Sequence, residues 1–216
     1  MIFVCSMGDL FHEDVTWEQI IQIFDAMNNN CQHRYLLLTK RPEAMNDFFS
    51  SLEDWQASEF PHIWLGVSVE NDKHLDRIET LLQIPAAKRF VSIEPMLGPV
   101  DLKNAFAANR YAWDEEQESE MLDWVICGGE SGPGARPMHP DWVRSVRDQC
   151  QAAGVPFFFK QWGAWTPLHE LRCNEPGIKG KMWHNFDPDN SVCKVGKKKA
   201  GRLLDGREWN ERPEYD

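Results

Sequence analysis

Short apolar runs that each end in charged or polar residues occur six times along this 216-residue chain. They cover residues 2–9, 35–41, 63–70, 90–94, 124–130 and 155–161. Continuous apolar runs of this length, separated by segments with helical spacing, are typical of buried strands in a parallel sheet. The alternation predicts an α/β fold of about six parallel strands with right-handed crossovers, either an open sheet or a partial (βα) barrel.

The ends of these runs define a candidate site. In a parallel α/β fold the C-terminal ends of the strands lie on one face, and that face carries the chemistry. We therefore expect residues from six separate places in the chain to come together there: Asp9, Lys40, Arg41, Glu70, Glu94, Glu130, Lys160 and Gln161.

The pattern changes after residue 163. Residues 1–163 predict the partial barrel, whereas residues 164–216 are rich in Gly, Pro, Lys and Trp and show little periodicity. We interpret them as an irregular extension packed on the barrel, with a hairpin turn at Asp205-Gly206. Thr16 and Gln19 predict a capping box at the start of a helix. Residues 114–120 are acidic and predict a solvated surface loop.

The composition limits the classes of function. The formal net charge of −11 argues against a general nucleic-acid-coating role, although a local basic patch could still bind phosphate. We find neither an apolar stretch of membrane-spanning length nor a signal peptide, and expect a cytoplasmic protein. The six cysteines lack metal-site spacing and are interpreted as small buried hydrophobes. The histidines do not predict a metal site either.

The most distinctive local sequence is the glycine-rich stretch 128–136. Gly128 and Gly129 would let a ligand approach the backbone closely, or would simply form a tight loop. The stretch has neither a P-loop nor a dinucleotide-binding spacing. Arg136 could bind a carboxylate or phosphate, or pair with Glu130.

The remaining strand-end groups also have two interpretations each. Lys40 and Arg41 suit an anionic ligand, or neutralise Glu70 and Glu94 on neighbouring strands. Glu94 follows an apolar strand directly and should be paired or functional. Lys160 could act as a base or a substrate clamp, or form a structural ion pair. The catalytic candidates are therefore Lys160, Glu94 and Glu130, and the candidates for substrate binding are Lys40, Arg41, Arg136 and Gln161.

Tryptophans and lysines interleave in the last third of the chain. Such residues could stack on bases and bind phosphates. Alternatively, the tryptophans pin the extension onto the barrel. The tryptophans concerned are Trp162, Trp165, Trp183 and Trp209.

Six motifs in order carry a family resemblance: residues 6–12, 38–43, 64–71, 92–99, 128–139 and 158–163. Together with the ending at 196–209 they resemble the bacteriophage Gp37/Gp68-like family of uncharacterised, DUF5131-type proteins. The resemblance covers the chain apart from the acidic loop. That family is similar to a divergent radical-SAM enzyme with a TIM-barrel-like fold.

This resemblance implies a [4Fe–4S] cluster and S-adenosylmethionine (SAM) as cofactors. It places Asp9 at the SAM amino group, and Ser68, Glu70 and Glu94 near the ribose and the methionine moiety. The three-cysteine unit that would hold the cluster is absent from this sequence. We therefore expect a truncated or fragmentary chain, inactive alone, whose first strand is an open edge able to pair with another chain.

Two other classes of function stay open from the sequence. The strand-end charges could hold a phosphate-containing ligand or nucleotide, with the Trp/Lys extension contacting nucleic acid. Alternatively, the chain could be a structural or interaction protein of a phage or prophage, with those charges serving only as ion pairs.

Overall fold

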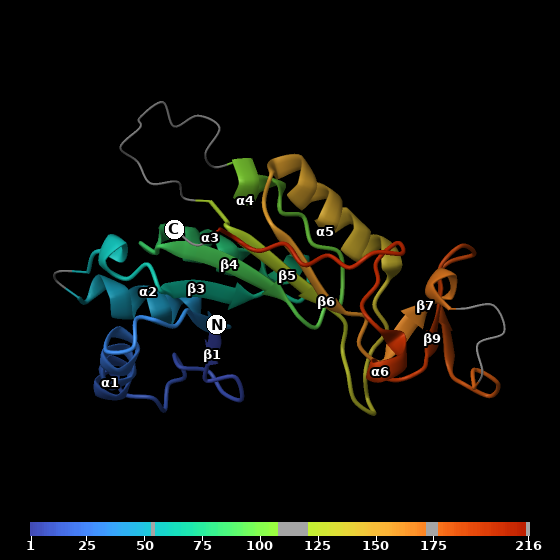
Figure 1. Ribbon diagram of the computed structural model, residues 1–216, viewed down its shortest axis with the longest axis horizontal. Coiled ribbons are helices and arrows are strands. Elements are labelled where there is room, and N and C mark those ends of the chain that lie inside the picture. The colour runs from blue at the N-terminus through green and yellow to red at the C-terminus, as the bar shows by residue number, and fades with distance from the viewer. Residues whose placement is uncertain (53–54, 108–120, 172–176, 215–216) are drawn as a thin grey trace. The chain divides into compact units, whose positions relative to one another are not determined.

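The computed structural model describes residues 1–52, 55–107, 121–171 and 177–214. The acidic stretch 114–120 and Cys173 lie outside these residues. All six predicted strands form, and they make one parallel sheet in chain order, so the α/β partial barrel is confirmed (Figure 1). The strands are β1 (Ile2–Val4), β2 (Tyr35–Thr39), β3 (Ile63–Ser68), β4 (Lys88–Ile93), β5 (Trp124–Gly128) and β6 (Phe157–Gln161).

The chain divides into two compact units. The first comprises Met1–Val69, His74–Ser92 and Lys103–Asp123, and the second comprises Glu70–Lys73, Ile93–Leu102 and Trp124–Asp216. The helices that follow the strands of the first unit are α1 (Trp17–Asn28), α2 (Pro42–Ser50), α3 (Asp76–Gln83) and α4 (Lys103–Ala107), with short 3-10 turns at Ala57–Glu59 and Asp72–His74.

The first unit is held by apolar side chains between its strands and helices. Leu36 on β2, Phe48 on α2 and Phe90 on β4 are almost completely buried. Gly66 on β3 lies against the Phe90 ring, which occupies the space that a side chain at Gly66 would need. The predicted capping box is confirmed, because the Thr16 amide donates to Gln19 Oε1 at 2.9 Å and the Gln19 amide donates to Thr16 Oγ1 at 3.4 Å.

The second unit contains α5 (Pro140–Ala153), which packs its Val143, Val146 and Cys150 inward. The extension after β6 is more regular than the sequence predicts. It forms a three-stranded antiparallel sheet in the order β7-β9-β8, and a short helix α6. The bounds are β7 (Trp165–Pro167), β8 (Trp183–Asn185), β9 (Ser191–Lys194) and α6 (Lys197–Ala200), with a 3-10 turn at Leu168–Glu170.

The end of the chain runs along the outer edge of β6. The Phe159 amide donates to the Trp209 carbonyl at 3.0 Å, and the Glu211 amide donates to the Phe157 carbonyl at 3.2 Å. These bonds cover an edge that would otherwise expose its backbone groups. Trp162, Trp165 and Trp209 are buried, and their indole Nε1 atoms donate to the carbonyls of Leu203, Ala135 and Leu204, whereas Trp183 is 42% exposed.

The hairpin turn predicted at Asp205-Gly206 is confirmed. Leu204 and Arg207 exchange backbone hydrogen bonds across it, at 2.9 and 3.4 Å. Asp205 has φ 53° and Gly206 has φ 79°. Two residues with positive φ fit a type I′ turn, for which Asp-Gly is a favoured sequence.

The first strand is an open edge, as predicted. Among the described strands, β1 pairs only with β2. Ile2 and Phe3 are 42% and 41% exposed. They border an open hollow of about 610 Å³ between β1 and α1, which Val4, Ile23 and Met27 also line.

The interpretation of the cysteines as buried hydrophobes is right for Cys127, Cys150 and Cys193 and wrong for Cys5 and Cys31. Strand β1 ends at Val4, so Cys5 is not part of the strand. It lies in a turn, with φ 52°. None of the helices in the described part of the chain is both long and apolar enough to span a membrane.

Candidate functional site

Asp9 is the centre of the strand-end groups in the first unit. Its Oδ1 accepts hydrogen bonds from the Phe11 amide at 3.0 Å and the Thr39 hydroxyl at 2.7 Å. Its Oδ2 accepts from the Lys40 amide at 3.1 Å and from Arg41 Nη1 at 2.9 Å. Asp9 therefore ties the loop after β1 to the end of β2.

These bonds also set the charge of Asp9. Burial raises the pKa of its carboxyl, but the hydrogen bonds from Thr39, Lys40, Phe11 and Arg41 together outweigh burial and hold the pKa below its ordinary value. Four donors occupy both oxygens, so the carboxylate has little capacity left for a ligand. Arg41 pairs with a carboxylate, but the partner is Asp9 and not Glu70 or Glu94, the partners that the sequence predicts for this role.

Ser68 lies at the end of β3 in the same unit and is buried. Its carbonyl accepts a hydrogen bond from Arg77 Nη1 at 2.8 Å, so helix α3 is fastened to this strand end.

In the second unit, Glu94 and Lys160 form an ion pair at 3.0 Å. The Glu94 side chain is 17% exposed and the Lys160 side chain 50% exposed. Gly128 makes room for this pair, because a Cβ at Gly128 would lie 2.5 Å from Glu94 Oε1. The pair therefore places one carboxylate and one ammonium group together, with the ammonium half open to solvent.

Glu130 and Arg136 form a second pair within the glycine-rich loop. Arg136 donates from Nε to Oε2 at 2.9 Å, from Nη2 to Oε1 at 2.8 Å and from its amide to Oε2 at 2.7 Å. The Arg136 hydrogen bonds lower the pKa of Glu130 to about 2. The structure thus shows Arg136 in the ion pair that was one of its two predicted roles, although its side chain is still 59% exposed.

The loops after β5 and β6 cross each other at Gly129 and Gly163. A Cβ at Gly129 would lie 2.1 Å from the Trp162 carbonyl oxygen, and one at Gly163 would lie 2.1 Å from the Glu130 carbonyl oxygen. The Gly129 amide donates to the Gln161 carbonyl at 2.9 Å. Gly129 and Gly163 therefore allow the backbones of these two loops to pack closely against each other.

Glu70 and Gln161 are both buried, at 8% and 9% exposure. The Glu70 carbonyl accepts from the Leu97 amide at 2.8 Å. Gln161 Oε1 is buried without a hydrogen-bond partner among the described residues. The β5–β6 register skips Lys160, because Cys127 pairs with Phe159 and Gly128 with Gln161. Gln161 Oε1 makes no hydrogen bond to Lys160 in the described part of the chain.

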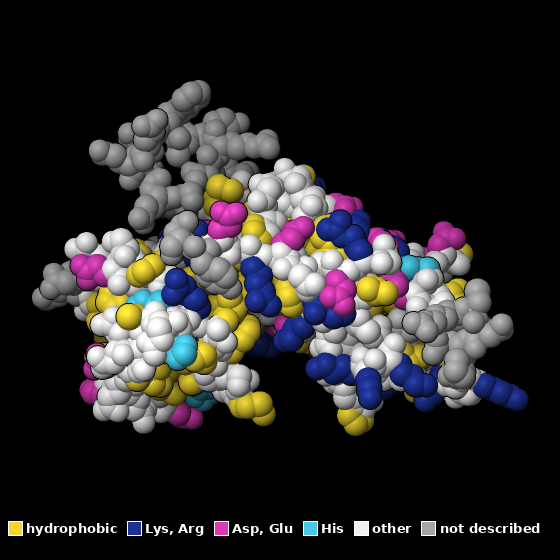
Figure 2. Space-filling view, in the orientation of Figure 1, with side chains coloured by type: hydrophobic (Ala, Val, Ile, Leu, Met, Phe, Trp, Pro, Cys, Tyr) yellow, Lys and Arg dark blue, Asp and Glu magenta, His cyan; other side chains and the backbone are white. Residues whose placement is uncertain are grey.

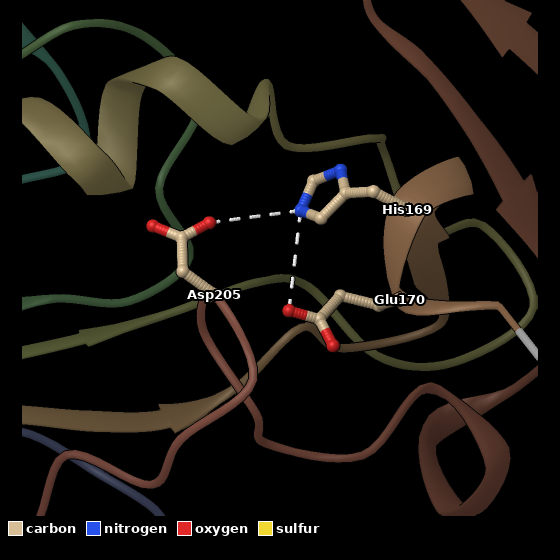
Figure 3. Close-up of side chains that lie close together, drawn as sticks. All are labelled: His169, Glu170 and Asp205. Carbon is tan, nitrogen blue, oxygen red and sulfur yellow. Dashed lines mark ion pairs between the residues drawn. The ribbon is translucent and has the colours of Figure 1, made fainter.

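One cluster of possible metal-binding side chains was not predicted from the sequence. Within the described residues, His169, Glu170 and Asp205 lie close together (Figure 3), with His169 Nε2 3.9 Å from Glu170 Oε1 and 3.8 Å from Asp205 Oδ1. Arg144 Nη2, however, lies 2.8 Å from both His169 Nε2 and Asp205 Oδ1, and Arg147 also pairs with Asp205. The guanidinium groups of Arg144 and Arg147 already neutralise the Asp205 carboxylate and would repel a metal cation. No local sequence signal connects these three residues.

An iron–sulfur cluster does not fit the described part of the chain. The one three-residue group found there that could hold a metal contains no cysteine.

Comparison with known proteins identifies a family whose function is not known. The sequence profile described as "Protein of unknown function (DUF5131)" matches residues 1–213. No match was found among curated proteins or among solved structures.

Proposed function

The chain belongs to the DUF5131 family, and we propose that its second unit binds SAM, or a close zwitterionic relative, at the Glu94–Lys160 pair. One observation carries this proposal: a carboxylate and a half-exposed ammonium lie 3.0 Å apart at strand ends, over a glycine that leaves them room.

The charges of the pair match those of an amino-acid ligand. The α-ammonium of SAM would donate to Glu94, and its α-carboxylate would accept from Lys160. A partly exposed ion pair contributes only about 0–1 kcal/mol to stability. Exchanging it for two charge-assisted bonds to a ligand therefore costs little.

The resemblance to Gp37/Gp68-like phage proteins and radical-SAM barrels supports this choice of ligand. The motif 92–99, which contains Glu94, and the motif 158–163, which contains Lys160, both belong to it. The resemblance points to Asp9 for the amino group, but the four hydrogen bonds on Asp9 favour Glu94 instead. Since no cluster site fits the described residues, the proposal for this chain is limited to ligand binding.

Isothermal titration calorimetry with SAM, S-adenosylhomocysteine and ADP tests the proposal. We expect SAM and S-adenosylhomocysteine to bind, because both carry the amino-acid group, and ADP not to bind. Glu94→Gln and Lys160→Gln should each weaken SAM binding by about tenfold, which corresponds to about 1.4 kcal/mol. Lys103→Gln, an exposed lysine on α4, is the matched control and should bind as the unmodified chain does.

Two results would contradict the proposal. One is the absence of a SAM signal at about 1 mM ligand, roughly the weak limit of specific binding. The other is SAM binding that all three variants retain. A signal from ADP alone would instead favour a phosphate-binding site, with Arg136 as the first residue to test.

A further inference from the structure

A cationic segment stands out in this acidic chain. Residues 190–204 contain five Lys or Arg residues and no Asp or Glu, whereas the whole chain has a net charge of −11. The segment covers β9, α6 and the approach to the Asp205-Gly206 turn. Figure 2 shows Lys and Arg side chains gathered on the surface where Figure 1 draws α6.

Two adjoining hollows in the second unit are lined by cations of this segment and by Lys181. The larger, of about 580 Å³, has Lys181, Lys194 and Lys197 in its wall. The smaller, of about 250 Å³, has Lys199 and Arg202 in its wall. Val195 lines both hollows, so the two adjoin.

The α6 lysines are available to a ligand. Lys197, Lys198 and Lys199 are exposed. In the described part of the chain no ion pair joins any of them to a carboxylate, in contrast to the strand-end cations Arg41, Arg136 and Lys160. An acidic group, Glu170, does line the smaller hollow, and it accepts from the Gly206 amide at 3.3 Å.

The larger hollow also offers backbone and apolar surface. Gly132, Gly180 and Gly196 line it with φ between 76° and 104°, and no atom lies within 4 Å of where their Cβ atoms would be. Phosphate oxygens could therefore approach these backbone segments closely. Met182 lines the same hollow and is 63% exposed, and the next residue, Trp183, is 42% exposed.

We propose that the surface formed by the two hollows, the α6 lysines Lys197, Lys198 and Lys199, and Trp183 binds single-stranded nucleic acid. We call it the α6 surface. Clustered lysines contact phosphates, and an exposed tryptophan can stack on an unpaired base. Helix α6 spans only Lys197–Ala200, too short to read the major groove of a duplex. At physiological salt the screening length is about 8 Å, so the acidic remainder of the chain does not cancel a local patch. The proposal does not depend on the SAM site.

Fluorescence anisotropy with labelled dT12 and rU12 oligonucleotides tests this proposal on the full chain. We expect one or both to bind with a Kd of about 1–100 µM at 50 mM salt and more weakly at 200 mM salt. The double variant Lys197→Gln with Lys199→Gln should bind about tenfold more weakly. Because two phosphate contacts are lost, the slope of log K against log salt should become shallower by about 1.4.

The matched control removes two exposed lysines elsewhere, Lys73→Gln with Lys103→Gln. It should change neither the affinity nor the salt slope. Thermal unfolding of both double variants should match the unmodified chain, since the substituted side chains are exposed. The proposal is overturned by no anisotropy change at 100 µM protein, by equal losses in both double variants, or by tighter binding of a 12-base-pair duplex than of either single strand.

Discussion

At the scale of single residues, Asp9 holds the end of β2 by hydrogen bonds to three successive residues, Thr39, Lys40 and Arg41. Asp9→Asn keeps the shape but removes one acceptor oxygen and the charge. We predict a loss of about 2 kcal/mol in the free energy of unfolding, because hydrogen bonds to a charged group are among the stronger ones. Urea denaturation measures it. Asp14→Asn, at a largely exposed carboxylate, should change little.

The pH dependence of this contribution follows from the direction of the pKa shift. The pKa of Asp9 lies below 3.8 in the folded chain, so its stabilisation is fully present above about pH 4 and is lost as the pH falls through the folded pKa. The stability difference between Asp9→Asn and the unmodified chain should therefore shrink below pH 4. A difference that stays constant down to pH 2 would assign the effect to shape instead of charge.

The sequence shows which strand ends carry charge, but not which charges pair. Arg41 had several acidic candidates, and the Asp9 pairing depends on how the loop after β1 folds back. Glu130 and Arg136 lie six residues apart in one loop, and here the sequence already contained the correct pairing as one of two alternatives. When two charged residues are close in sequence, the loop between them limits which pairs can form. When they are far apart in sequence, the pairing depends on strand register.

At the scale of elements, the crossing of the β5 and β6 loops depends on glycine. Gly129→Ala would place a Cβ 2.1 Å from the Trp162 carbonyl oxygen, and a backbone atom cannot move aside as a flexible side chain can. We predict a loss of at least about 2–3 kcal/mol in the free energy of unfolding.

Gly134→Ala is the control in the same loop. It has no atom within 4 Å of the added Cβ, and its φ is not in the left-handed region. It should be neutral or stabilise the chain by about 0.5 kcal/mol. Equal effects of the two substitutions on thermal unfolding would contradict the crossing.

The Asp205-Gly206 turn is joined to helix α5 by charge. Asp205 Oδ1 accepts from Arg144 Nε at 2.9 Å and Nη2 at 2.8 Å, and Arg147 pairs with Oδ2. Asp205→Asn retains the tolerance for positive φ but loses both ion pairs. We predict a loss of about 1–2 kcal/mol in the free energy of unfolding, measured by urea denaturation. Asp189→Asn, at an exposed carboxylate, is the control and should leave the free energy of unfolding unchanged.

Elements were predictable where their apolar pattern was strong. All six parallel strands follow continuous apolar runs, and β3 is buried at every position. The small antiparallel sheet was not predicted, because β7 and β8 have only three residues each and β8 is exposed throughout. The turn at Asp205-Gly206 was predictable because its backbone conformation needs those residue types.

At the scale of the whole molecule, the parallel sheet has two different edges. The edge at β6 is covered by residues 209–211, while β1 presents its backbone and the side chains of Ile2 and Phe3. We predict concentration-dependent self-association through β1, measured by sedimentation velocity. Ile2→Lys should reduce it, because a charge on an edge strand opposes pairing. Leu168→Lys, at another exposed apolar residue, should not, and association unaffected by Ile2→Lys would contradict the prediction.

The unequal edges also limit how far such association can proceed. Fibrils grow because every added chain presents a fresh edge to the next one. Here a copy that joins through β1 uses its own β1 in the contact, and its other edge is already closed by its own backbone. Strand addition would therefore end at a closed pair, and a chain with an exposed apolar strand is protected from open-ended polymerisation by residues 209–211 along its opposite edge.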